Sequence, residues 1–94
     1  MNNIFLIGVA SLLISSGVLA RETNSMRSSF ELVSLGDSEQ SLLKKMGKPR
    51  PRYFIYQDGH YSCAATEYKY DIDMQQFAVW TCHGQVFKID VKNK

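Results

Sequence analysis

The chain has 94 residues, a formal net charge of +2 and two cysteines, which is enough for one small domain and excludes a large multi-domain enzyme. The charge is unevenly distributed, because residues 1–20 contain no Asp, Glu, Lys or Arg. The remaining residues have the composition of a small soluble domain. A domain of that size has a limited hydrophobic core, and we therefore expect a covalent crosslink to support it.

The first twenty residues have the pattern of an export signal. An apolar run extends from Ile4 to Val18, Val18-Leu19-Ala20 is a small-residue pattern that signal peptidase accepts, and charge begins at Arg21. The run is shorter than the roughly 20 residues that span a bilayer, which disfavours the alternative, a membrane anchor. We interpret residues 1–20 as a signal peptide cleaved near Ala20, which predicts a periplasmic or secreted protein in an oxidising compartment.

After the signal peptide, residues 21–29 are polar and without periodicity, and we expect a flexible leader before a domain over residues 30–94. Residues 30–35 are a short apolar-rich stretch that fits a strand or a single turn. A helix is expected from the N-cap Asp37, with Gln40 completing a capping box, to about Met46. The helix should end there because Gly47 and Pro49 follow. Its narrow apolar face is suited to packing on a sheet and consists of Leu42, Leu43 and Met46.

Turn residues divide the rest of the chain into four strands. Asp58-Gly59 and His83-Gly84 are two-residue hairpin signals, and residues 71–74 are the expected loop between the second and third strands. With that loop centred between residues 72 and 73, Cys63 falls directly opposite Cys82, at a separation that a disulfide can bridge. The sequence therefore predicts an α+β fold, one helix packed on an antiparallel meander of about four strands, with a Cys63–Cys82 disulfide.

A zinc site formed by the two cysteines with His60 and His83 is the competing interpretation. Each histidine lies an odd number of residues from the nearer cysteine, so in continuous strands both histidines face away from the cysteines. We therefore expect no metal site. The sequence also shows no phosphate-binding glycine loop and no nucleophile elbow, so we expect no cofactor and a non-enzymatic protein.

The predicted register sorts the strand residues onto two faces. One face, which includes Trp80 and Phe87, is expected to be the core beneath the helix. The opposite face is too apolar to be left bare in water, and three occupants remain open for it: residues 30–35, a second copy of the chain, or a partner protein. On the last interpretation the partner-binding candidates are Tyr53, Ile55, Tyr68, Tyr70, Phe77 and Val79.

Five cations lie within nine residues, with no acidic residue among them: Lys44, Lys45, Lys48, Arg50 and Arg52. In an exported protein such a cluster indicates contact with an anionic surface, either lipid headgroups, lipopolysaccharide phosphates or acidic protein, and not with nucleic acid. The alternative is an ordinary solvated helix end and loop.

A family resemblance adds to these expectations. The stretch Val33-Ser34-Leu35-Gly36-Asp37-Ser38 with Met46-Gly47-Lys48-Pro49 resembles the helix signature of the SmpA/OmlA (BamE-like) family, and of a related group of small exported bacterial proteins with a V-x-x-G-D-S opening. Val79-Trp80 and Gly84-Gln85-Val86-x-x-Ile89 resemble the closing strands. The resemblance covers residues 30–91 and implies a small α+β domain in the envelope of a Gram-negative bacterium. No site residue follows from it.

Together these features predict an exported, non-enzymatic protein-interaction module that binds an envelope protein. The alternative function is a periplasmic or secreted inhibitor of an enzyme such as a lysozyme or a β-lactamase, because similar helix-plus-sheet domains serve as inhibitors.

Overall fold

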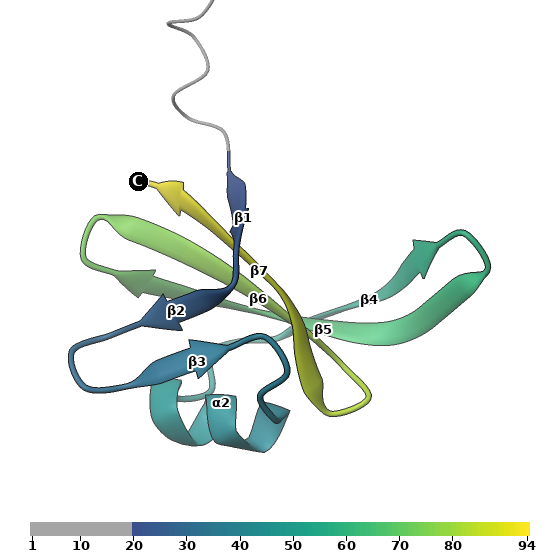
Figure 1. Ribbon diagram of the computed structural model, residues 1–94, viewed down its shortest axis with the longest axis horizontal. Helices are drawn as coiled ribbons and strands as arrows, with labels where there is room; N and C mark the ends of the chain where they lie inside the picture. Colours follow the sequence, from purple (N-terminus) through teal and green to yellow (C-terminus); the bar gives the residue numbers. More distant parts are fainter. Residues whose placement is uncertain (1–19) are drawn as a thin grey trace, which may run out of the picture.

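A computed structural model of the protein describes residues 20–94, so the predicted signal peptide lies outside the described residues apart from Ala20. Two antiparallel sheets and one helix make up the fold (Figure 1). The elements are β1 (Arg21–Thr23), β2 (Ser25–Arg27), β3 (Leu32–Ser34), α2 (Glu39–Met46), β4 (Arg52–Asp58), β5 (Tyr61–Ile72), β6 (Gln75–Cys82) and β7 (Gln85–Asn93). The larger sheet has the order β1-β7-β6-β5-β4, and β2 pairs with β3 in the smaller one.

The predicted α+β fold with a meander of about four strands is wrong, because the domain is mostly sheet and consists of a five-stranded sheet, a two-stranded sheet and one short helix. Residues 21–29, expected to be a flexible leader, supply β1 and β2. Arg21 lies opposite Val91 at the edge of the large sheet, and the buried Met26 lies opposite Val33 in the small one. Three-residue strands with at most one apolar residue are too short to show the alternation by which strands are recognised.

The helix α2 begins one residue later than predicted. Ser38 is its N-cap, since the hydroxyl of Ser38 accepts a hydrogen bond from the backbone N–H of Ser41 at 3.0 Å. The Asp37 carboxylate instead accepts one from the N–H of Ser34 at 2.9 Å, which closes the turn after β3. The end of the helix agrees with the prediction, because Gly47 has a φ of +86° that favours glycine. Within residues 20–94 no helix is long and apolar enough to cross a membrane.

Two of the three predicted hairpins are shifted. The β4–β5 turn is Gly59-His60, and the β5–β6 turn is only the two residues Asp73-Met74, with Asp73 at a φ of +56°. The shorter second turn moves that register by two residues, so that Ala65 and not Cys63 lies opposite Cys82. The third turn, His83-Gly84, is confirmed, and both of its residues have the positive φ that a tight hairpin turn requires.

The main core lies between the large sheet and a layer formed by α2, β2 and β3. Its buried side chains are Met26, Val33, Leu42, Tyr68, Tyr70, Phe77, Val79, Val86, Ile89 and Val91. This is the sheet face opposite to the one expected beneath the helix, although Leu42, Leu43 and Met46 are the helix residues that pack on it. The segment before the helix is fixed over β7 on this side, because the N–H of Gly36 donates to the Val86 carbonyl at 2.8 Å.

A register shift between Trp80 and Thr81 marks a β-bulge in the β6–β7 pair and changes the predicted faces of β7. Val86 and Ile89 are an odd number of residues apart, so strict alternation along the strand places them on different faces. Both are buried in the main core, together with Val91. The extra residue of the bulge therefore explains why strict alternation assigned part of β7 to the wrong side.

The β4–β5 hairpin projects from the rest of the domain (Figure 1). The long strand β5 pairs with β4 over Tyr61–Glu67 and with β6 over Ala65–Ile72, so the two pairings overlap at only three residues. Beyond that overlap, residues 55–64 form a two-stranded ribbon, called the arm below. A two-stranded hairpin alone is marginally stable in water. The predicted disulfide is present and joins Cys63 of the arm to Cys82 at the end of β6.

Candidate interaction surface

Four of the six predicted partner-binding residues are buried and cannot meet a partner: Tyr68, Tyr70, Phe77 and Val79. The layer formed by α2, β2 and β3, called the helix layer below, covers them. The hydroxyl of Tyr68 donates to the Glu39 carboxylate at 2.5 Å, and the hydroxyl of Tyr70 donates to the Gly47 carbonyl at 2.8 Å. The expectation that this face is too apolar to be left bare in water is confirmed, because most of it is buried. The occupant is mainly α2, with β2 and β3, and Val33 comes from the 30–35 stretch that was one of the alternatives.

Tyr53 and Ile55 are the two predicted candidates that remain accessible, with 73% and 65% of their surface exposed. Both belong to β4, the edge strand, which the helix layer does not cover. With Ala64 and Thr66 of β5 they line a shallow hollow on the helix side of the sheet. The exposure of this pair therefore comes from the position of β4 beyond the core.

The other face of the sheet holds a second group of aromatic residues, formed by β4, β5, β6 and β7 without the helix layer. We call it the aromatic face, and its members are Phe54, Tyr56, Tyr61, Trp80 and Phe87. The ring centroids of Phe54 and Trp80 are 4.8 Å apart, and those of Tyr56 and Phe87 are 5.0 Å apart, in edge-to-face arrangements that aromatic pairs favour. The rings lie over the buried Cys63, Ala65 and Cys82 and are themselves only partly buried, with Tyr61 about half exposed.

Two cations lie on the aromatic face. The ammonium of Lys88 is 4.6 Å from the centroid of the Trp80 ring, and the guanidinium of Arg52 is 4.6 Å from that of Phe54. These are cation–π distances. The bulge beside Trp80 explains why Phe87 and Lys88, although adjacent in sequence, both contact this face.

Glu67 is buried at the inner edge of the aromatic face and holds one of its rings and one of its cations in place. Its carboxylate accepts hydrogen bonds from Nε of Arg52 and from Nε1 of Trp80, both at 2.9 Å. The hydrogen bond from Arg52 lowers the pKa of Glu67, with a smaller contribution from Trp80, against the opposing effect of burial. Glu67 is therefore an anion that holds the indole and the guanidinium in place.

The Glu67 network was missed because the predicted strand register was shifted by two residues and did not place Arg52 or Trp80 opposite this carboxylate. In the structure Arg52 and Trp80 are the residues directly opposite Glu67 on the two neighbouring strands. A correct strand register would have predicted the contact, since opposite charges on facing positions attract.

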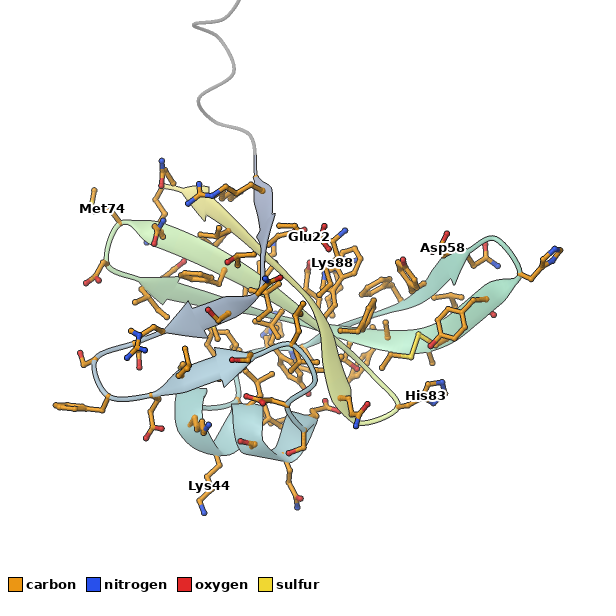
Figure 2. The ribbon with its side chains drawn as sticks, in the orientation of Figure 1. Glu22, Lys44, Asp58, Met74, His83 and Lys88 are labelled. Carbon is orange, nitrogen blue, oxygen red and sulfur yellow. A yellow bond between two sulfur atoms is a disulfide. The ribbon has the colours of Figure 1, made fainter. Side chains whose placement is uncertain are left out.

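The five cations of the predicted anionic-surface cluster do not act as one patch. Arg52 is bound to Glu67, and the ammonium of Lys45 donates to the Leu32 carbonyl at 2.9 Å. Lys44 projects from α2 into solvent, away from the arm (Figure 2), and Lys48 and Arg50 are exposed in the segment that follows the helix. Contact of these last three with an anionic lipid or lipopolysaccharide stays a prediction.

The two histidines lie at turns. His60 is exposed at the tip of the arm, and His83 is exposed in the β6–β7 turn. Among residues 20–94 no group of three or more His, Cys, Asp or Glu side chains is placed to hold a metal ion.

Comparison of the chain with protein-family models, with curated proteins and with solved structures finds no match. The resemblance to the SmpA/OmlA family therefore stays a prediction. Function has to be inferred from the chemistry of the surface itself.

Proposed function

We propose that the protein is an exported, non-enzymatic interaction module of the bacterial cell envelope, and that it binds its partner protein through the aromatic face. One observation carries this proposal: five aromatic side chains, two of them with a cation at the ring, gather on a sheet face that the helix layer leaves open. Aromatic residues and arginine are enriched where proteins bind one another, because rigid rings bury much area for little conformational entropy.

Export is supported by two independent features. The apolar run before Ala20 has the form of a signal peptide, and Cys63 and Cys82 are joined in a disulfide. Disulfides persist in oxidising compartments and are rare in the cytosol. An envelope location then makes an envelope protein the natural partner of the aromatic face.

The surface also indicates the chemistry of that partner. Lys88 is half-buried with its ammonium over the indole, so its remaining N–H donors are held at a fixed place beside an apolar ring. A partner segment that combines an apolar or aromatic side chain with a carboxylate would fill both positions at once. We therefore propose an acidic-aromatic segment of an envelope protein as the ligand.

Site-specific photo-crosslinking in the native host tests this function. A photoreactive residue in place of Tyr61, on the aromatic face, should capture an envelope protein. The same residue in place of Met74, which is more accessible than Tyr61 and lies in the β5–β6 turn away from this face, should not (Figure 2). The variant Lys88→Glu should weaken capture by Tyr61, because it opposes an acidic ligand. Equal capture from both positions, or retention of residues 1–20 in the mass of the protein, would overturn the proposal.

The arm provides the specific observation that favours the second candidate, an enzyme inhibitor. It ends in the exposed turn Gly59-His60 and is restrained by the disulfide, which are features of a preformed loop that enters an active-site cleft. An inhibitor would form a stoichiometric complex with a purified lysozyme or β-lactamase. Such a complex should be lost in His60→Ala and retained in Lys88→Glu, which is the opposite pattern to that of the envelope module.

A further inference from the structure

The strand β4 is an open edge of the sheet. It is the last strand in the order β1-β7-β6-β5-β4, and within residues 20–94 it pairs only with β5. The opposite edge, β1, is only three residues long, whereas β4 has seven. A long exposed edge presents unpaired backbone donors and acceptors, and natural sheets usually cover such an edge or disrupt it. This edge lacks a proline within Arg52–Asp58 and is not covered by the helix layer.

The backbone groups that remain open can be assigned from the hairpin. The two-residue turn makes Asp58 and Tyr61 the closing pair, which exchanges both backbone hydrogen bonds, and such pairs alternate along an antiparallel ladder. Residues 52, 54, 56 and 58 therefore bond to β5, while Tyr53, Ile55 and Gln57 direct their N–H and C=O groups outward. The side chains of these three are also exposed.

We infer that this edge pairs with the same edge of a second copy of the chain, to form a two-fold symmetric dimer centred on Ile55. The sequence of β4 is self-complementary about that residue. In an antiparallel pairing Ile55 meets Ile55 of the second copy, and Arg52 meets Asp58 of the second copy at both ends. Facing opposite charges favour a pairing of strands, and like charges oppose it.

The geometry of Arg52 allows this contact. Only its Nε is engaged with Glu67, and its side chain is 57% exposed at the edge of the sheet. The guanidinium has further N–H donors beyond Nε, and these can reach a carboxylate on the strand alongside. Asp58, the residue that would supply this carboxylate, is exposed at the far end of β4.

The alignment of the two β4 strands in the dimer follows from their open backbone groups and their charges. A two-fold pairing centred on Ile55 places all seven residues of β4 opposite a residue of the second copy and aligns outward backbone groups with outward backbone groups. A pairing centred on Phe54 or on Tyr56 also aligns the backbone, but it leaves two residues unpaired and separates Arg52 from Asp58. The full-length register is therefore the one that this sequence favours.

The dimer has a consequence for the aromatic face. A two-fold axis perpendicular to the sheet keeps both aromatic faces on the same side of one continuous sheet. Phe54 of one copy then lies beside Tyr56 of the other, so the two aromatic clusters become one. This inference goes beyond the proposed function and does not depend on it, because self-association can be measured on the purified protein without any partner.

The first experiment measures self-association of the mature protein by sedimentation over a range of concentrations. The protein should be a dimer at high concentration. Ile55→Pro removes an outward N–H without breaking a β4–β5 bond, and it should weaken dimerisation at least about tenfold. Asp58→Lys, which places a cation opposite Arg52, should weaken it similarly. Met74→Lys is the control, because Met74 is more exposed than Ile55 but lies away from the edge, and it should leave dimerisation unchanged.

The second experiment tests the register by disulfide trapping. Under mild oxidation Ile55→Cys should crosslink to itself, whereas Tyr53→Cys and Gln57→Cys should crosslink to each other when mixed but not separately. Circular dichroism of each variant verifies the fold. A protein that is monomeric at every concentration, or a dimer insensitive to Ile55→Pro, would refute the inference. Self-crosslinking at residue 53 or 57 would refute the register. If the protein is monomeric but a photoreactive residue at position 61 still captures an envelope protein, the dimer is refuted and the proposed function is retained.

Discussion

Cys63 and Cys82 are joined on a diagonal across the β5–β6 pair. Cys82 lies opposite Ala65, two residues further along β5 than Cys63, and the Cα atoms of the two cysteines are 6.4 Å apart. Among the strands that the structure describes, β4 is the only partner of β5 at Cys63. The disulfide is therefore the covalent connection between the arm and the end of β6, and it lies directly beneath the aromatic face.

Removal of the disulfide should loosen the arm more than the core. Cys63 and Cys82 are 19 residues apart in the sequence. The double variant Cys63→Ala with Cys82→Ala should lose about 3 kcal/mol of unfolding free energy, as expected for a disulfide that closes a loop of that size. Hydrogen exchange should rise in residues 55–64 before it rises in β6 and β7, because a two-stranded ribbon has little support of its own. Denaturant unfolding and exchange mass spectrometry measure the two effects. The wild-type protein after reduction is the control and should behave like the variant.

The disulfide also shows which features of the fold could be predicted from the sequence. The predicted register was wrong by two residues, but a shift of two keeps every side chain on the same face, so the two cysteines stayed close enough to pair. Gly47 and His83-Gly84 were predicted correctly because a helix end and a tight turn depend on the local backbone alone.

The side of the sheet that the helix covers could not be predicted, because it depends on contacts between distant residues. The Gly36–Val86 hydrogen bond and the bulge beside Trp80 both influence it, and neither has a local signal. The candidate surface was therefore assigned to the face that the helix layer covers, where only Tyr53 and Ile55 of the six candidates stay exposed, and the contacts of Glu67 with Arg52 and Trp80 were missed.

Truncation of Phe77, one of the predicted partner-binding residues that is buried, should destabilise the domain strongly. Phe77 is 7% exposed in the main core, so Phe77→Ala should cost about 3 to 5 kcal/mol of unfolding free energy. The matched change Met74→Ala affects a side chain that is 74% exposed in the neighbouring turn, and it should cost no more than about 0.5 kcal/mol. Urea unfolding measures both. Equal effects would contradict the placement of Phe77 beneath the helix layer.

The Glu67 network should make stability depend on acid pH. The folded protein lowers the pKa of Glu67, chiefly through the Arg52 hydrogen bond, so ionised Glu67 stabilises the fold fully above its unfolded pKa of about 4.3. That stabilisation is lost as the pH falls through the lower pKa of the folded state. Unfolding free energies measured across this range should show the loss in the wild type but not in Glu67→Gln.

Trp80 offers a direct measurement of the same titration, because it is the only tryptophan of the chain and its indole donates to Glu67. Its fluorescence should change as Glu67 is protonated in the folded protein. The change should persist in the control Glu22→Gln, which alters an exposed glutamate on β1, and disappear in Glu67→Gln. A fluorescence change that survives Glu67→Gln would assign the titration to another group.

Alkaline pH should destabilise the domain through the two tyrosines beneath the helix. Burial, with a smaller effect of the Glu39 charge, raises the pKa of Tyr70 to about 12, and burial with the Glu39 hydrogen bond raises the pKa of Tyr68 further. Because both pKa values rise on folding, this stabilisation is complete below the ordinary tyrosine pKa of about 10 and is lost as the pH rises above it. Unfolding free energies should therefore fall from about pH 10 upward. Tyr70→Phe should reduce that dependence, and Tyr53→Phe, a change to an exposed side chain, should not. An identical alkaline dependence in Tyr70→Phe and the wild type would show that Tyr70 does not contribute to it.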